Sequence, residues 1–345
     1  MKTRITEILS IKYPILLSGM SFISVPKLVA AVSNAGGLGM LATGTLNAEQ
    51  TRQSLREIRS LTDKPFGANA TLLFPGAIEN ANILLEEKVP VINFALGKGD
   101  WIAKQAHTYG GKVIATVVNS RHAKRAEDYG CDAVIATGHE AAAHGGDVTT
   151  LVLVPRLANI LKIPVIAAGG FGDGRGLAAA LSLGAEGIAM GSRFANTLES
   201  PVHDKTKQLT IAKDITDTLY TDRFDGMPAR VMDTPGARKA MKRRVGLWTA
   251  FLNSFAIAKE MKIPYYKLFF QTLSAGLRET MLLAYLAKGF RGFRLSIVEG
   301  DCDEGVYPVG QVTGLIQDAP TVAELVERIV AEAKLAQSKL GDMLS

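Results

Sequence analysis

The stretch Ile163–Arg193, IPVIAAGGFGDGRGLAAALSLGAEGIAMGSR, contains the pattern that decides the fold. It begins with a short apolar run, Ile163–Ala168, which is followed by a glycine-rich turn and an Ala/Leu-rich helical segment over 174–183. A second apolar run, Ala185–Met190, ends in Gly-Ser-Arg. Parallel strands require a crossover of this kind, and its helix covers one face of the sheet. The stretch therefore predicts strand, helix and strand, with a glycine turn after each strand.

The same alternation of apolar runs and helical segments extends over residues 1–195. Eight β-type runs occur: Pro14–Leu17, Leu38–Leu41, Phe66–Ala70, Val89–Phe94, Lys112–Val117, Ala133–Ala136, Ile163–Ala168 and Gly187–Met190. They are almost continuously apolar, which indicates strands buried on both faces. Eight β-then-α units predict an α/β fold of the (β/α)8 TIM-barrel type. A doubly wound open sheet is the alternative, but its GxGxxG pattern is missing from the first turn.

The pattern changes after the eighth run. Residues 197–300 contain helical segments with polar connections, namely Asp204–Lys213, Thr234–Lys259 and Tyr265–Lys288. We expect residues 1–196 and 306–345 to form the barrel, and residues 197–305 to form a helical subdomain on the substrate side. The segment Thr321–Lys339 is an amphipathic helix that opens on a capping box.

Composition limits the classes of protein to consider. The chain has 345 residues, 47% hydrophobic residues and a net charge of +6. The basic run Lys239–Arg244 is interpreted as a solvated helix face, so no nucleic-acid partner is expected. Cys131 and Cys302 match neither a metal spacing nor a disulfide framework, which fits a reducing compartment. With no apolar stretch long enough to span a membrane and no signal-peptide pattern, we expect a cytoplasmic protein.

The two glycine turns point to an anion site. Glycines that directly follow strands let backbone N–H groups approach an anion without a Cβ in the way. In a (β/α)8 barrel, the turns after strands seven and eight form the usual phosphate site. The alternative is that these glycines only make tight turns. Two such turns in tandem favour the phosphate site.

The residues that follow the predicted strands are rich in glycine, hydroxyl and amide groups and poor in carboxylates. They include Ser18–Ser21, Asn69–Thr71, Thr116 and Thr137–Gly146. Such a set suits a hydrogen-bonding cofactor with a phosphate tail better than a divalent metal. The two histidines after strand six are five positions apart rather than the four of a zinc helix, so no metal is expected.

His144 is the candidate acid–base residue. It follows strand six among small residues that leave room for a ligand, and an imidazole can accept or donate a proton near neutral pH. The alternative is a loop histidine bonded to the backbone. A serine nucleophile is not expected, because the chain has no GxSxG.

These motifs resemble those of the FMN-dependent nitronate monooxygenases, formerly called 2-nitropropane dioxygenases. The resemblance covers essentially the whole chain through YPILLSGM, SNAGGLGML, FGANATLL, GHEAAAHGG, AAGGFGDGRGLAAALSLGAEGIAMGSRF and GQVTGLI. The same group contains flavin-dependent NAD(P)H:quinone reductases and FMN enoyl-acyl-carrier-protein reductases. One departure is the turn before the histidine, which is Glu-Ala-Ala-Ala-His here and usually Glu-Ala-Gly-Gly-His in the family.

The resemblance implies a TIM barrel with FMN at the C-terminal ends of its strands. Through it, Gly169, Gly170, Gly191 and Ser192 are expected to bind the FMN phosphate. Gly19, Met20 and Ser21 would lie against the isoalloxazine ring, and Asn69, Thr71 and Thr116 would hydrogen-bond the flavin. The expected cofactor-binding set also contains Thr137, Ala142, Ala168 and Met190. His144 occupies the position of the family's catalytic histidine.

Three functions remain open at this stage. The first, which the resemblance favours over the other two, is a nitronate monooxygenase that oxidises alkyl nitronates with O2 to a carbonyl compound and nitrite. The second is an NAD(P)H-dependent flavin reductase acting on quinones or enoyl thioesters. The third is a barrel that binds a phosphorylated ligand without redox chemistry. The sequence gives neither the physiological substrate, the preference for NADH or NADPH, nor the oligomeric state, for which a homodimer is one option.

Overall fold

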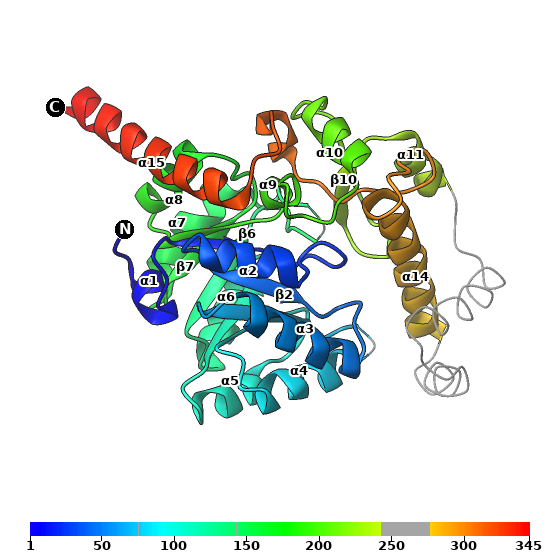
Figure 1. The fold of residues 1–345 in the computed structure, drawn as a ribbon, viewed down its shortest axis with the longest axis horizontal. Helices are drawn as coiled ribbons and strands as arrows, with labels where there is room; N and C mark the ends of the chain where they lie inside the picture. The colour runs from blue at the N-terminus through cyan, green and yellow to red at the C-terminus, as the bar shows by residue number, and fades with distance from the viewer. Residues whose placement is uncertain (75, 143, 243–276) are drawn as a thin grey trace.

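The computed structural model describes residues 1–74, 76–142, 144–242 and 277–345 (Figure 1). Its centre is an eight-stranded parallel sheet in the order β1-β8-β7-β6-β5-β4-β3-β2. The strands are β1 (Ile15–Leu17), β2 (Gly39–Ala42), β3 (Phe66–Thr71), β4 (Val91–Ala95), β5 (Lys112–Val117), β6 (Ala133–Thr137), β7 (Val165–Ala168) and β8 (Gly187–Met190). Each predicted apolar run contains or overlaps one of them.

Two backbone hydrogen bonds join β1 to the start of β2. Leu17 N–H donates to the Leu38 carbonyl at 2.9 Å, and Leu38 N–H donates to the Ile15 carbonyl at 3.0 Å. Since β1 also pairs with β8, these bonds close the sheet on itself. The prediction of a (β/α)8 barrel is confirmed.

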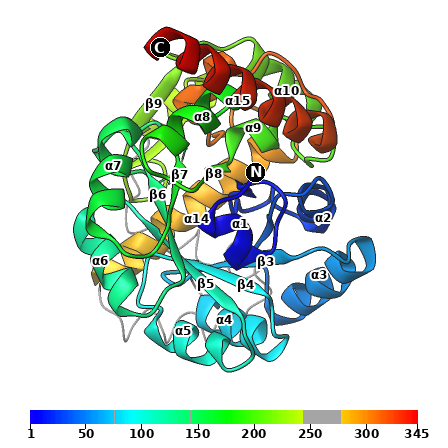
Figure 2. The same ribbon diagram turned by 90° about the vertical axis from the view of Figure 1, so that its left-hand side faces the viewer.

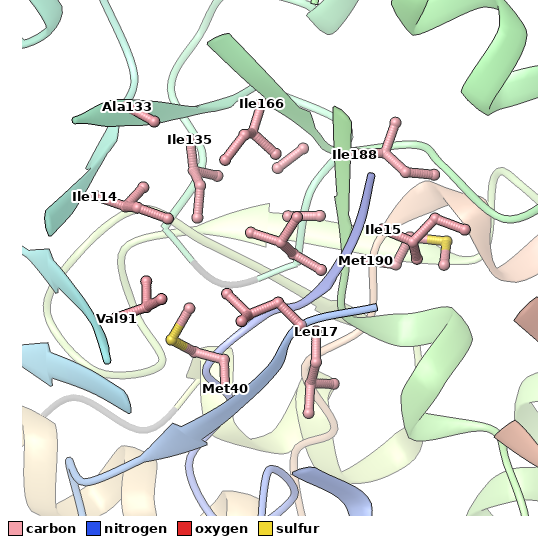
Figure 3. Close-up of a cluster of buried hydrophobic side chains, with 14 of the residues drawn as sticks. Ile15, Leu17, Met40, Val91, Ile114, Ala133, Ile135, Ile166, Ile188 and Met190 are labelled. Atoms are coloured by element: carbon pink, nitrogen blue, oxygen red, sulfur yellow. The ribbon is translucent and has the colours of Figure 1, made fainter. Parts of the chain in front are cut away.

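The interior of the barrel is filled by the side chains of alternate strand residues. Figure 3 shows Met40, Val91, Ile114, Ile135 and Ile166 pointing toward one another from five strands. These five side chains are at most 7% exposed. Branched aliphatic residues are typical of this layered filling, which makes the barrel a packed core rather than a channel.

Helices surround the strands (Figure 2). They are α2 (Pro26–Asn34), α3 (Ala48–Leu61), α4 (Ala77–Glu86), α5 (Asp100–His107), α6 (Ser120–Asp128), α7 (Thr150–Ile160) and α8 (Gly174–Ser182). The helix α15 (Val322–Leu344) packs against α8 and α2 and takes the eighth position in the ring. Its predicted capping box is confirmed, because Thr321 and Glu324 cap each other's backbone N–H groups. The short α1 (Arg4–Leu9) adds Ile5 and Leu9 to the core.

The segment after β8 differs in part from the prediction. It contains α9 (Ser192–Ala195), α10 (Asp204–Ile211), β9 (Thr218–Thr221), β10 (Ala229–Met232), α11 (Pro235–Lys242), α14 (Leu277–Ile297) and the 3-10 helix η1 (Gln311–Leu315). Residues 218–232, expected to be a polar connection between helices, instead contain β9 and β10, which form an antiparallel hairpin. Residues 243–276 of the two longer predicted helices lie outside the described residues.

The helix α14 lies across the end of the barrel at which the strands finish (Figures 1 and 2). Its side chains Leu286, Phe290 and Phe293 line the same cavity as residues that follow β1 and β3. None of the described helices is both long and apolar enough to cross a membrane.

Close packing of α8 on α15 yields a stability prediction. A Cβ at Gly174 would lie 2.3 Å from the Ile329 carbonyl oxygen and 2.4 Å from the Ala333 nitrogen. Gly174→Ala is therefore expected to lower the free energy of unfolding by about 1–3 kcal/mol, measured by thermal or chemical denaturation. Gly341→Ala in α15 is the control, because a Cβ there meets nothing within 4 Å. Equal stability of the two variants would contradict this packing.

Candidate active site

A cavity of about 730 Å³ opens at the C-terminal ends of the barrel strands. Its volume is typical of small-molecule and cofactor sites, which span ~300–1,000 Å³. The structure brings every site residue predicted from the sequence to this cavity: Gly19, Met20, Ser21, Asn69, Thr71, Thr116, Thr137, Ala142, His144, Ala168, Gly169, Gly170, Met190, Gly191 and Ser192. The individual roles of these residues stay predictions.

The two glycine turns border the cavity where β7 and β8 end. Gly169 and Gly170 have φ angles of 103° and 83°, a conformation that glycine adopts without strain. In the described part of the chain, no acceptor is found for the backbone N–H groups of Gly170, Gly191 and Ser192. The Ser192 hydroxyl accepts a bond from Gly310 N–H at 3.0 Å, which ties the returning chain to this turn. Unpaired N–H groups beside a cavity fit an anionic group such as a phosphate.

A network of amides and hydroxyls lies at the ends of β3, β4 and β5. The Asn69 amide donates to Asn93 Oδ1 at 2.5 Å, and Asn93 Nδ2 donates to the Ile114 carbonyl at 3.0 Å and to Thr116 Oγ1 at 3.1 Å. Thr71 Oγ1 donates to Asn69 Oδ1 at 3.2 Å. Both asparagine side chains are buried. The network fixes the orientation of the Asn69 amide at the cavity wall.

The loop between β6 and α7 is held by buried polar contacts. The Glu140 carboxylate accepts bonds from the Thr150 backbone N–H at 2.9 and 3.1 Å and from its hydroxyl at 2.8 Å. From β10, the buried Arg230 guanidinium donates two bonds to the His139 carbonyl at 3.0 and 3.2 Å. These contacts constrain the backbone that leads to His144.

His144 lies beside a buried carboxylate. Its Nε2 is 3.2 Å from Oδ2 of Asp225, whose side chain is 4% exposed, and its Nδ1 is 3.3 Å from the Pro228 carbonyl. Asp225 belongs to the turn between β9 and β10, so the hairpin delivers it to the barrel. The helix α14 comes close to this turn at Gly289, where a Cβ would lie 2.6 Å from the Asp225 Cβ.

Both ring nitrogens of His144 thus face oxygen acceptors. Only the doubly protonated ring has a donor for each of them. Burial alone would lower the pKa of His144, but the hydrogen bond with Asp225, its charge and the Pro228 carbonyl outweigh burial and raise the pKa. The site therefore favours an imidazolium, which can donate a proton to a ligand in the cavity.

Aromatic side chains form an apolar wall of the cavity. The Phe290 ring of α14 meets Phe74 edge-on, with ring centroids 5.2 Å apart, and meets Phe22 at 6.2 Å. Such edge-to-face pairs stabilise packing beyond simple burial. They join α14 to the loops after β1 and β3. This side of the cavity therefore offers an apolar surface to the apolar part of a ligand.

Asp225, Asn93 and Phe290 are site residues that the sequence-based prediction did not include. The Asp225-Gly226 dipeptide between two β-type runs is a hairpin signal and could have indicated the turn. Asn93 is a polar residue within an otherwise apolar strand, which is also a usable signal. No local pattern shows that Phe290 reaches the barrel.

Other candidate residues have structural surroundings. His139 Nδ1 is 2.9 Å from the Gly146 carbonyl, and its ring meets Tyr220 edge-on at 4.6 Å. Burial raises the pKa of the Cys131 thiol to about 12 and also raises that of Cys302, which makes both thiols poor nucleophiles. Among the described residues, no group of three His, Cys, Asp or Glu side chains could hold a metal ion.

Fold and cavity together define a (β/α)8-barrel enzyme with paired glycine turns and a histidine–aspartate pair at the strand ends. Comparison with known families narrows this class, because the family model described as nitronate monooxygenase matches residues 2–83 and 77–332. The chain belongs to the nitronate monooxygenase family, and it is an oxidoreductase that acts on small molecules.

Three similar proteins show the breadth of this family. A (3aS,4S,5R,7aS)-5-hydroxy-7a-methyl-1-oxo-octahydro-1H-indene-4-carboxyl-CoA dehydrogenase from Rhodococcus jostii is 36% identical, over 99% of this chain and 98% of the relative. A probable nitronate monooxygenase from Staphylococcus aureus is 34% identical, over 66% of this chain and 78% of the relative. The structure of FabK from Thermotoga maritima superposes with a TM-score of 0.84 at 38% identity, covering 99% of both chains.

The histidine–aspartate pair makes a testable titration prediction. Asp225→Asn is expected to lower the pKa of His144, because the hydrogen bond and the negative charge that raise it are weakened or lost, and NMR titration of the histidine ring measures the change. Since the folded-state pKa is raised above 6.5, the pair stabilises the wild-type fold fully below that pH, and the stabilisation is lost as the pH rises through the folded-state pKa. Asp222→Asn, on the exposed part of the same turn, is the control. An unchanged His144 titration in Asp225→Asn would refute the pairing.

Proposed function

We propose that the protein is an FMN-dependent reductase that uses NAD(P)H to reduce an enoyl thioester. The observation that carries this proposal is the His144 ring held as a proton donor by Asp225 at the cavity. Reduction of a conjugated double bond consumes a hydride and a proton, so the site needs a group that is protonated at neutral pH. FMN, when bound, would supply the hydride transfer.

The residues present fit a phosphate-tailed flavin. Gly170, Gly191 and Ser192 would offer the phosphate backbone N–H groups that have no acceptor among the described residues. Gly19 and Met20 would line the ring, while the fixed amide of Asn69 would hydrogen-bond it. In this proposal the remaining predicted residues complete the cofactor wall, namely Ser21, Thr71, Thr116, Thr137, Ala142, Ala168, Gly169 and Met190.

In this proposal, His144 transfers the proton. Asp225 positions the imidazole ring and keeps it protonated. The imidazolium donates its proton to the α-carbon of the enoyl group as the hydride reaches the β-carbon, which saturates the double bond. A substrate group would replace the 3.3 Å contact with Pro228, while the bond to Asp225 keeps the ring charged before transfer. The aromatic wall of Phe74 and Phe290 would exclude water from the apolar part of the substrate.

The extent of the relatives' similarity supports a thioester substrate. The Rhodococcus relative, which is named for a CoA-linked substrate, matches 99% of this chain, whereas the Staphylococcus relative matches 66%.

We further propose that residues 1–196 and 306–345 bind the cofactor, and that residues 197–305 shape the substrate side. A cytoplasmic location and a homodimer also belong to the proposal.

Nitronate oxidation is the second candidate, and the name of the matching family model favours it. Here the products would be a carbonyl compound and nitrite, with O2 as the oxidant. As an imidazolium, His144 would orient the anionic nitronate. As a neutral imidazole, His144 would abstract the α-proton of a nitroalkane. Because the pKa of His144 is raised, proton abstraction would require a higher pH than with an isolated histidine.

Anaerobic stopped-flow spectroscopy distinguishes the two candidates. The FMN-loaded protein is mixed separately with NADH, NADPH and propionate 3-nitronate, and the reduced protein is then mixed with crotonyl-CoA. We expect a nicotinamide to bleach the flavin and crotonyl-CoA to restore it. His144→Ala should slow the second step by roughly 10²–10⁴-fold while leaving the first nearly unchanged. Bleaching by the nitronate alone would replace the reductase proposal with the monooxygenase.

The cofactor cradle is tested by a glycine substitution. Gly170→Val is expected to lose FMN, because its side chain would stand at the phosphate approach and its φ of 83° disfavours a branched residue. Flavin content of the purified protein, read from absorbance, measures the effect. Gly130→Val is the matched control, with a φ of 81° at a turn before β6 and nothing within 4 Å of its Cβ. Full flavin content in Gly170→Val would remove this phosphate site.

A further inference from the structure

The cavity has a branch that runs outside the barrel wall. In β4 and β5, Asn93 and Thr116 face the barrel interior, so their neighbours Phe94 and Val117 face outward by strand alternation. Phe94 and Val117 nevertheless line the cavity, together with Tyr129 at the end of α6. The branch therefore lies between the strands β4 and β5 and the helix α6, with an apolar and aromatic floor.

Three basic side chains form the rim of this branch. Lys98 follows β4, His122 and Arg125 lie on α6, and all three line the cavity and are exposed. Within the described ranges, neither the Lys98 nor the Arg125 side chain has a hydrogen bond or an ion pair, whereas the neighbouring Lys124 pairs with Glu127 at 2.7 Å.

The backbone that carries Lys98 is fixed close to the floor of the branch. A Cβ at Gly99 would lie 2.3 Å from the Phe94 ring, and one at Gly97 would lie 2.5 Å from the Leu72 Cβ. Such approaches are possible only for glycine. The loop after β4 therefore holds the Lys98 backbone at the cavity mouth.

The electrostatic environment of the rim is positive. The pKa of His122 is lowered, first by partial desolvation of this otherwise exposed side chain and then by the charges of Arg121 and Arg125. Among the described residues, the carboxylates that line the cavity are Glu140 and Asp225. Both already have partners, in Thr150 and His144 respectively, and so do not neutralise the rim.

We propose that this branch binds the nucleoside diphosphate part of a ligand, with Lys98 and Arg125 contacting the pyrophosphate and the aromatic floor receiving the base. Unpaired basic groups are the usual partners of phosphate, and planar bases pack on aromatic side chains. The assignment of the ligand rests on the proposed function, in which two reactants carry such a group. These are a CoA thioester and the nicotinamide cosubstrate.

Calorimetric titration of the FMN-loaded protein tests the branch without turnover. The probes are CoA, ADP-ribose and pantetheine, the last of which has the thiol arm of CoA without its phosphates. Lys98→Gln combined with Arg125→Gln is expected to weaken binding of CoA or ADP-ribose by ~10–100-fold, since charge-assisted bonds are lost. Pantetheine binding is expected to change less than twofold. Arg121→Gln is the matched control, because Arg121 lies on α6 but does not line the cavity.

The identity of the weakened probe separates the two sources. Loss of CoA affinity assigns the branch to the thioester carrier, and loss of ADP-ribose affinity assigns it to the nicotinamide cosubstrate. The proposal is overturned if the double variant binds both nucleotides like wild type, if wild type binds neither, or if Arg121→Gln weakens binding equally. Because binding is measured directly, a protein that binds CoA but never reduces crotonyl-CoA would reject the proposed function and keep this site.

Discussion

Backbone hydrogen bonding between Leu17, Leu38 and Ile15 closes a parallel sheet that would otherwise have two free edges. Closure places the C-terminal ends of all eight strands at one end of the barrel. Residues as far apart in sequence as Gly19 and Ser192 meet at one cavity for this reason. The apolar interior below them sets the floor of the site, so the polar groups of the site lie between the middle and the C-terminal end of each strand and in the loops.

Most of the barrel could be predicted from the sequence, because each strand is buried on both faces and appears as a short apolar run. The place of the two glycine turns at the cavity was predictable for a related reason, since turns directly after β7 and β8 lie at the C-terminal end of such a barrel. The segment after β8 was harder to predict from the sequence. Residues 218–232 were expected to be a polar connection between two helices, and only tertiary packing distinguishes such a connection from the hairpin that turns at Asp225-Gly226.

The partners of the site side chains depend on that same packing. His144 could be selected by residue type and position, but its partner Asp225 lies 81 positions later on a separate hairpin. No local pattern relates the two residues. Likewise, a sequence alone does not show that Phe290 of α14 meets Phe74 of a barrel loop, since both are ordinary apolar residues in their own segments.

The delivery of Asp225 by the β9–β10 hairpin has a consequence for how such a barrel can diversify. The glycine turns at the cavity follow barrel strands, whereas the pKa of His144 is raised by a segment outside the barrel strands. Removing the carboxylate of that hairpin alone would lower the pKa of the same histidine and so favour a proton acceptor over a proton donor. The acid–base chemistry of the site would then change while the barrel strands and the glycine turns stay as they are.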